Sequence, residues 1–179
     1  MKLKTLFNSL SLSLFLLLLT FITTINLHAQ DNQPKPLDIS FLNLIQGTWA
    51  GESEMMGTKM NEELVITMNF NNQFLIINLT AGSEDKTHTY TGMGVYGSDA
   101  EGNVSSYWFD DWGLSNISTG TGKIDGMKMT LDAKSPTSVS KRSMELTGGN
   151  LVMKWTSTWK DKDGQEQTMS NETTYAKRK

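Results

Sequence analysis

Apolar and polar side chains alternate with a period of two from Trp49 onward. Trp49, Ser53 and Met55 fall on one face, and the acids Glu52 and Glu54 fall on the other. Because successive side chains of a β-strand point to opposite faces, the alternation predicts a strand whose Trp49 face points inward. The next run repeats the period, and its predicted inner face is formed by Leu64, Ile66, Met68 and Phe70.

The same rhythm continues to the end of the chain, with short turns between the runs. Residues 74–79 form an unbroken apolar run, which predicts a strand covered on both faces. Another strand is predicted from Trp112 to about Ile124, before the hairpin signal Asp125-Gly126. About ten strands therefore follow one another at a spacing of roughly 8 to 15 residues, without a long helical pattern between them.

This spacing predicts an all-β fold. Because closure removes exposed sheet edges, we expect a closed or nearly closed antiparallel up-and-down barrel of about ten strands. A short helical turn through Phe41, Leu42 and Ile45 is predicted ahead of it, with Asp38 as its cap. A barrel of this size leaves room for one small ligand.

The first 36 residues carry a different pattern. Lys2 and Lys4 precede a nearly continuous apolar segment over residues 10–25, and Ala29 ends a small-residue cleavage pattern. We therefore expect a signal peptide at 1–29, export to the periplasm or the medium, and cleavage near Ala29. The apolar core is shorter than the ~20 residues of a spanning helix, so no transmembrane segment is predicted. A flexible lead-in is expected over 30–36 and the barrel domain over 37–179.

Composition narrows the function classes. Residues 1–29 hold two of the 16 basic residues and no acid, which leaves 14 basic against 19 acidic residues and a net charge of −5. Three consecutive basic residues occur only at the end of the chain, so nucleic acid is not an expected partner. The chain has no cysteine, which excludes disulfides, a cysteine nucleophile and a lipid-modified N-terminal cysteine. The oligomeric state does not follow from the sequence.

The motif Gly47-x-Trp49 behind a short helix, within a meander of about ten strands, resembles the calycin superfamily of lipocalins and fatty-acid-binding proteins. The resemblance implies that Trp49 closes the floor of the barrel. It also implies that a basic side chain near the end of the chain, Lys177 or Arg178, lies across the tryptophan.

A bacterial family of lipocalin-like barrels of unknown function is similar over most of residues 41–179. Its glycine-rich strand, turn with Asp and Trp-x-Asp strand resemble Gly92-Met93-Gly94-Val95-Tyr96-Gly97-Ser98-Asp99 and Trp108-Phe109-Asp110. Residues 160–164 and 175–179 also look like that family's ending.

Nitrobindin-like haem barrels are similar too, since they begin with a Gly-x-Trp strand. They hold iron with a histidine late in the chain, whereas His88 is the last histidine of this sequence. The resemblance therefore implies haem only as an alternative cofactor, with His88 as its ligand. Otherwise no cofactor is expected.

The glycines Gly92-x-Gly94-x-x-Gly97 match the dinucleotide-binding fingerprint letter for letter. That fingerprint requires a helix directly after it, because the helix N-terminus binds the pyrophosphate. Here a turn and another predicted strand follow, so we interpret the glycines as strand positions with close neighbours.

The alternation places a set of residues on the inner faces of the predicted strands, and these are the ligand-binding candidates. They are Trp49, Met55, Leu64, Ile66, Met68, Tyr90, Trp108, Asp110, Met153 and Trp155. Methionine adapts to varied apolar shapes, so it suits a cavity as well as an ordinary core. An inward Asp110 is interpreted either as a polar ligand anchor or as a buried acid bonded to Tyr or Trp. Its neighbour Asp111 points to the opposite face, so the two are not an acid/base pair.

A chain with one histidine after the predicted cleavage site and no cysteine offers no nucleophile–base set. No catalytic residue and no metal site are therefore predicted. We expect an exported barrel that binds a small apolar or amphipathic molecule, rather than an enzyme. The alternatives are a haem-binding barrel and a solid-cored envelope protein that meets a partner through its surface.

Overall fold

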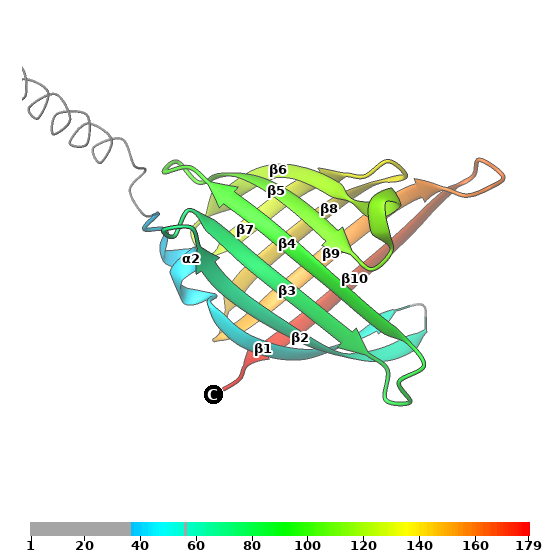
Figure 1. The fold of residues 1–179 in the computed structure, drawn as a ribbon, viewed down its shortest axis with the longest axis horizontal. Helices are drawn as coiled ribbons and strands as arrows, with labels where there is room; N and C mark the ends of the chain where they lie inside the picture. Colours follow the sequence, from blue (N-terminus) through cyan, green and yellow to red (C-terminus); the bar gives the residue numbers. More distant parts are fainter. Residues whose placement is uncertain (1–36, 56) are drawn as a thin grey trace, which may run out of the picture. The chain divides into compact units, whose positions relative to one another are not determined.

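A computed structural model describes residues 37–55 and 57–179 and shows ten antiparallel strands in one closed barrel (Figure 1). This confirms the all-β barrel predicted from the alternating pattern. The predicted signal peptide (1–29) and lead-in (30–36) lie outside the described residues. Within the described ranges no helix is long and apolar enough to cross a membrane.

The elements in chain order are α2 (Ser40–Leu44), β1 (Gly47–Met55), β2 (Thr58–Asn69), β3 (Phe74–Gly82), β4 (Thr89–Ser98), β5 (Asn103–Asp110), the 3-10 helix η1 (Gly113–Asn116), β6 (Ser118–Asp125), β7 (Lys128–Lys134), β8 (Ser138–Thr147), β9 (Asn150–Lys160) and β10 (Glu166–Lys177).

Each strand pairs with its neighbours in sequence, and β1 pairs with β10 to close the ring. Across that seam Trp49 lies opposite Lys177, and Gly51 lies opposite Tyr175. The first and last strands are therefore paired on both sides, and none of the ten described strands is an edge of the sheet.

The two ends of the barrel differ. Helix α2 lies at the end where β2 turns into β3 (Figure 1), and the backbone N–H of Leu37 donates there to the carbonyl of Asn72 at 3.3 Å. We name this the helical end. The opposite end, which we name the mouth, carries the connections that follow β1, β3, β5, β7 and β9, including η1.

The apolar core fills the helical end. The indole Nε1–H of Trp49 donates to the carbonyl of Ile45 at 2.7 Å, which joins the first strand to the residue after α2. Lys177 Nζ lies 5.2 Å from the centre of the Trp49 ring and donates to the carbonyl of Leu44 at 3.2 Å. The basic side chain across the tryptophan is therefore Lys177 rather than Arg178. The largest fully buried side chains are Phe41, Ile45, Trp49, Leu64, Ile66, Leu75, Ile77, Met129 and Leu151.

Two strand predictions are wrong near the helical end. Phe70 does not continue the inner face of β2, because the chain turns there; its φ is 52° and its side chain is 75% exposed. Residues 74–79 are not covered on both faces. Leu75 and Ile77 are buried against the core, whereas Phe74 on the outer face is 40% exposed.

Two local predictions are also wrong. Residues 113–116 form η1 rather than part of a strand, and β6 begins only at Ser118. Asp38 does not cap α2: the residue at the N-cap is Ile39, and Asp38 accepts instead from the side-chain amide of Asn43 at 3.1 Å. The short helix is held by its apolar side chains, since Phe41 is completely buried.

Trp49→Ala should lower the free energy of unfolding by about 3–5 kcal/mol, because it empties a fully buried site and removes the bond to Ile45. Urea unfolding followed by circular dichroism measures this loss. Trp112→Ala is the control: that side chain is 64% exposed, and we expect a change within about 0.5 kcal/mol. Equal losses in the two variants would contradict this role of Trp49.

Candidate functional site

Several strands pass from a fully buried inner position in the core to a partly exposed inner position nearer the mouth. On β8, Met144 is 2% exposed, whereas Arg142, on the same face, is only partly buried. The region of the interior with such positions, here called the mouth half, is lined by Tyr90, Asp110, Arg142, Trp155, Met169 and Asn171.

A chain of hydrogen bonds crosses the mouth half. Trp108 Nε1–H donates to the hydroxyl of Tyr90 at 3.0 Å, and that hydroxyl donates to Asp110 Oδ2 at 3.1 Å. Asp110 also accepts from the side-chain amide of Asn116 at 2.5 Å and from the backbone N–H of Trp112 at 3.1 Å. The carboxylate is thus the acid bonded to Tyr that the sequence suggested, and it fixes the loop containing η1 to the interior.

Two glycines of β4 make room for aromatic rings. A Cβ on Gly92 would lie 2.3 Å from Cζ2 of Trp108, and a Cβ on Gly94 would lie 2.5 Å from Cε2 of Tyr96. The interpretation of these glycines as strand positions with close neighbours is confirmed. A turn and β5, not a helix, follow the glycine-rich segment, so the geometry of a dinucleotide site is not built there.

Arg142 is a functional candidate that the sequence analysis missed. Its Nη2 donates to Ser118 Oγ at 3.1 Å, its Nε donates to Ser140 Oγ at 3.2 Å, and its Cζ lies 5.6 Å from the centre of the Trp108 ring. A guanidinium stacked on an indole and bonded to two neutral hydroxyls is a fixed positive charge inside the barrel. The alternation of the strand could have identified it, because Arg142 lies two residues from Met144 and therefore on the same inner face of β8.

Glu62 is a second inner residue that the sequence analysis missed. It is 6% exposed and points into the barrel from β2, on the same face as Leu64. The hydroxyls of Ser53 and Tyr175 each donate to one of its carboxylate oxygens. The Tyr175 ring reaches Glu62 by crossing β1 at Gly51, where a Cβ would lie only 2.9 Å from its Cδ1. The carboxylate therefore joins β10, β1 and β2 from the inside.

The phenols of the interior are held in their neutral form. Burial raises the pKa of Tyr175, and the carboxylate of Glu62 raises it further. Burial also raises the pKa of Tyr90, with the charge of Asp110 adding to the rise. The pKa of Tyr96 is raised by burial as well. These side chains are therefore O–H donors well into the alkaline range.

Five of the ten predicted ligand-binding residues belong to the packed core or pack against it. Trp49, Leu64 and Ile66 are each at most 1% exposed, and Met68 and Met153 pack against the same cluster. Their tight packing assigns them to the floor and the lower wall of the barrel.

The other five predicted residues lie nearer the mouth. Tyr90, Trp108 and Asp110 are brought together by the hydrogen bonds described above. Trp155 lies on the inner face of β9, one inner position nearer the mouth than Met153. Met55 is partly exposed at the end of β1, beside the turn into β2.

His88 lies in the loop between β3 and β4 and is exposed. Its Nδ1 is 2.9 Å from the hydroxyl of Thr87, and its backbone N–H donates to Ser83 Oγ at 3.0 Å. This geometry does not direct the imidazole into the barrel. Across 37–55 and 57–179 no three His, Asp or Glu side chains are grouped closely enough to hold a metal ion.

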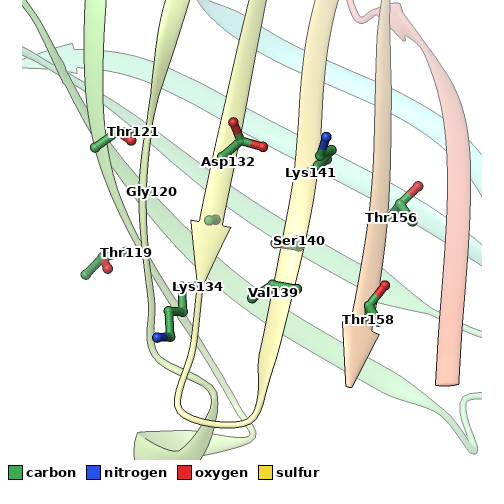
Figure 2. A pocket seen from close by; sticks show the side chains of 11 residues that line it. Thr119, Gly120, Thr121, Asp132, Lys134, Val139, Ser140, Lys141, Thr156 and Thr158 are labelled. Carbon is green, nitrogen blue, oxygen red and sulfur yellow. The ribbon is translucent and has the colours of Figure 1, made fainter. Parts of the chain in front are cut away.

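A groove of about 590 Å³ lies on the outer face of β6–β9 (Figure 2). Its walls carry outward-facing side chains, such as Lys141 and the exposed Val139, and none of the ten predicted ligand-binding residues is part of it. The groove is lined by Thr119, Gly120, Thr121, Asp132, Ala133, Lys134, Val139, Ser140, Lys141, Thr156 and Thr158.

No model of a known protein family matches this sequence, and no curated protein matches it significantly. Among solved structures, Rv2717c from M. tuberculosis aligns with a TM-score of 0.58 at 15% identity, over 79% of this chain and 99% of that one. A redesigned β-barrel, mFAP1, bound to DFHBI aligns with a TM-score of 0.38 at 17% identity, over 78% and 100% of the two chains. Zebrafish ileal bile acid-binding protein complexed with cholic acid aligns with a TM-score of 0.38 at 18% identity, over 75% and 99%. The likeness to Rv2717c shows the fold alone, which is a closed antiparallel β-barrel.

Gly92→Ala should displace the Trp108 indole and lower the free energy of unfolding by about 1–3 kcal/mol, because the new methyl overlaps the ring. Urea unfolding and the near-ultraviolet circular dichroism of the tryptophans measure the two effects. Gly82→Ala is the matched control on β3, since a Cβ there approaches only the carbonyl of His88, at 4.0 Å. An unchanged tryptophan signal in Gly92→Ala would contradict the proposed contact.

Stability should fall as the pH rises above about 10. In the unfolded chain tyrosine ionises near pKa 10.0, whereas Tyr90, Tyr96 and Tyr175 keep their protons in the folded state. Above pH 10 the unfolded state therefore binds fewer protons than the folded state, so the free energy of unfolding decreases as the pH rises. The stability that these three tyrosines contribute is fully present only below pH 10. Urea unfolding at pH 9, 10 and 11 measures the slope. Tyr175→Phe should make it shallower by up to about 1.4 kcal/mol per pH unit, and an unchanged slope would rule out this linkage.

Proposed function

We propose that this protein is an exported, non-enzymatic barrel that binds a small apolar or amphipathic molecule in its mouth half. The observation that carries the proposal is the partial exposure of side chains that face inward. Trp155 and Arg142, opposite each other on β9 and β8, both keep accessible surface although they point into the barrel. We infer that space adjoins them inside the ring of strands.

The side chains around that space are of the kinds that small-molecule sites combine. Trp155 offers a ring face, and Met169 offers a flexible apolar surface. Tyr90 and Arg142 supply polar groups whose positions are fixed by hydrogen bonds. An apolar surface with a few oriented polar groups is typical of a binding site for a small molecule.

The interior is a better candidate than the groove on the outer face. The outer groove is open and lined mainly by exposed threonine and lysine side chains, without an aromatic ring. A small molecule bound there would stay largely in contact with water and would gain little from burial of apolar surface.

Two features of the sequence support the remaining parts of the proposal. The basic, apolar and small-residue pattern that ends at Ala29 supports export. The order of the glycine-rich strand at 92–97 and the Trp-x-Asp strand at 108–110 supports membership of the bacterial family of lipocalin-like barrels that this chain resembles.

Titration of the protein with the neutral dye N-phenyl-1-naphthylamine, whose fluorescence rises in apolar surroundings, tests the proposal. We expect saturable binding, weakened roughly tenfold in Trp155→Leu because a ring contact of about 1.4 kcal/mol is lost. Thr156→Ala changes the next residue of the same strand, which faces outward, and should leave the affinity unchanged. Absence of saturable binding, or a loss of stability in Trp155→Leu without a loss of affinity, would refute an interior binding site.

A further inference from the structure

The outer faces of the strands differ in composition around the barrel. The strands β3, β4 and β5, on the near side of the barrel in Figure 1, contain one charged residue, Asp110. Its carboxylate accepts from Tyr90 in the interior, so the outer face of these three strands carries no charge. The outer faces of β7 to β10 instead carry lysines and acids, such as Lys154 and Glu172, which form an ion pair.

Large apolar side chains lie next to one another on the outer face of β2 to β5. Ile76, Val95 and Tyr107 are opposite one another on β3, β4 and β5, and Met93 is opposite Phe109 in the neighbouring row. Because opposed residues on one face of an antiparallel pair have their Cβ atoms about 5 Å apart, these side chains form one continuous surface. We name it the apolar wall, and its residues are Val65, Phe74, Ile76, Met93, Val95, Tyr107 and Phe109.

The apolar wall continues toward the helical end through two aromatic rings. The ring of Phe74 lies over Gly97 of β4, where a Cβ would be 3.1 Å from its Cε1. Phe70, in the turn between β2 and β3, packs edge-on against Phe74 with 6.0 Å between the ring centres. Both rings are exposed, so no described segment of the chain covers them.

The wall is large for an exposed apolar surface. The exposed fractions are 37% for Val65, 39% for Met93, 40% for Phe74, 52% for Tyr107 and 75% for Phe70. At roughly 150–250 Å² for a large side chain, these fractions correspond to about 500 Å² of accessible surface. Single exposed apolar side chains are ordinary, but a contiguous patch of this size typically marks an interaction surface. With the polar side chains between and beside these residues, the face approaches the roughly 800 Å² that each partner buries in a stable complex.

The lack of charge on the wall favours a second copy of this chain as the partner. Its polar groups include the Tyr107 hydroxyl and the side-chain amide of Asn78, which lies between Val65 and Met93 in the register. A hydroxyl and an amide each both donate and accept, so each is able to pair with its own counterpart. A two-fold axis brings the same patch of both partners together, and an uncharged patch then meets itself without repulsion between like charges. A charged partner surface would find no counter-charge here.

An anionic lipid surface fits the wall less well. The strands β3, β4 and β5 contain no lysine or arginine, and the chain that follows the predicted cleavage site has a net charge of −5. Attraction of a protein to anionic headgroups depends on clustered basic side chains, which this face lacks.

We propose that the protein forms a two-fold symmetric dimer in which the apolar wall of one copy packs against the apolar wall of the other. The two sheets would meet face to face, with the side chains of their outer faces interdigitated as in the packing of one sheet on another. The inference concerns the outside of the barrel and does not depend on the proposed interior binding site.

Analytical ultracentrifugation of the full-length protein, from micromolar to submillimolar concentration, tests the dimer. We expect a monomer–dimer equilibrium. Met93→Lys and Tyr107→Lys each place a charge in the buried interface, and the symmetry places it there twice. Each should raise the dissociation constant of the dimer by about tenfold or more. Both side chains are exposed in the single barrel, so we expect the fold to persist, which far-ultraviolet circular dichroism verifies.

Val139→Lys is the matched control, since it introduces the same charge at a 54% exposed apolar residue on the outer face of β8, outside the wall. It should leave the equilibrium unchanged. Cross-linking gives a second measurement that does not depend on the lysine variants. Because the chain has no cysteine, Asn78→Cys introduces a unique thiol. A short bis-maleimide should link Asn78→Cys into a covalent dimer, but not Thr156→Cys on the outer face of β9.

The outcomes distinguish the possible occupants of the wall. A monomer at every concentration overturns the inference, and binding to phosphatidylcholine vesicles that Met93→Lys abolishes would then assign the wall to lipid. A dimer whose dissociation constant is unchanged by the two wall variants, or raised equally by Val139→Lys, also overturns it, because association would then use another part of the chain. If the lysine variants fail to fold, the cross-linking decides, and equal cross-linking of the two cysteine variants contradicts the proposed interface.

Discussion

Closure between β1 and β10 is the constraint on which the interior depends. With β1 paired on both sides, the register fixes every inner position, and a shift of one residue would turn the inner side chains outward. Gly51 lies at this seam and leaves room for the Tyr175 ring to cross β1 and donate to Glu62. The strands on either side of β1 are thereby linked through a buried carboxylate whose oxygens are both satisfied, so the polar interior and the closed sheet stabilise each other.

The closed ring is filled unevenly along its length. At the helical end Trp49 and the short helix occupy the floor, and large apolar side chains pack above them at close to complete burial. Nearer the mouth the inner positions on one wall pass to Gly120, Ala133 and Ser140, which cannot reach across the barrel. The backbone pairing is continuous through this change. The volume of the inner side chains therefore falls along this wall, from large apolar groups at the helical end to small ones nearer the mouth.

The alternating pattern was sufficient to predict the closed barrel, the short helix, the position of Trp49 and the inward direction of Trp108. It failed at Phe70 and at residues 113–116, because there the backbone conformation of a turn overrides a hydrophobic side chain. It also missed Glu62 and Arg142. Charged residues in an alternating run are normally interpreted as outward-facing, and a single sequence does not show which of them are paired inside. Parity counted from a secure inner neighbour would have placed both.

The remaining question is why the described strands place the charges of Glu62, Asp110 and Arg142 inside the barrel. Glu62 joins the seam, and Asp110 fixes the mouth loop while accepting from Tyr90, so each carboxylate has a structural role. Arg142 on β8 donates to Ser118 on β6 and packs on Trp108 of β5, so it joins three strands through neutral partners. An apolar side chain of similar length would pack there at a lower desolvation cost. The guanidinium at the boundary of the packed core therefore links strands through its contacts at a cost in hydration that an apolar side chain would not carry.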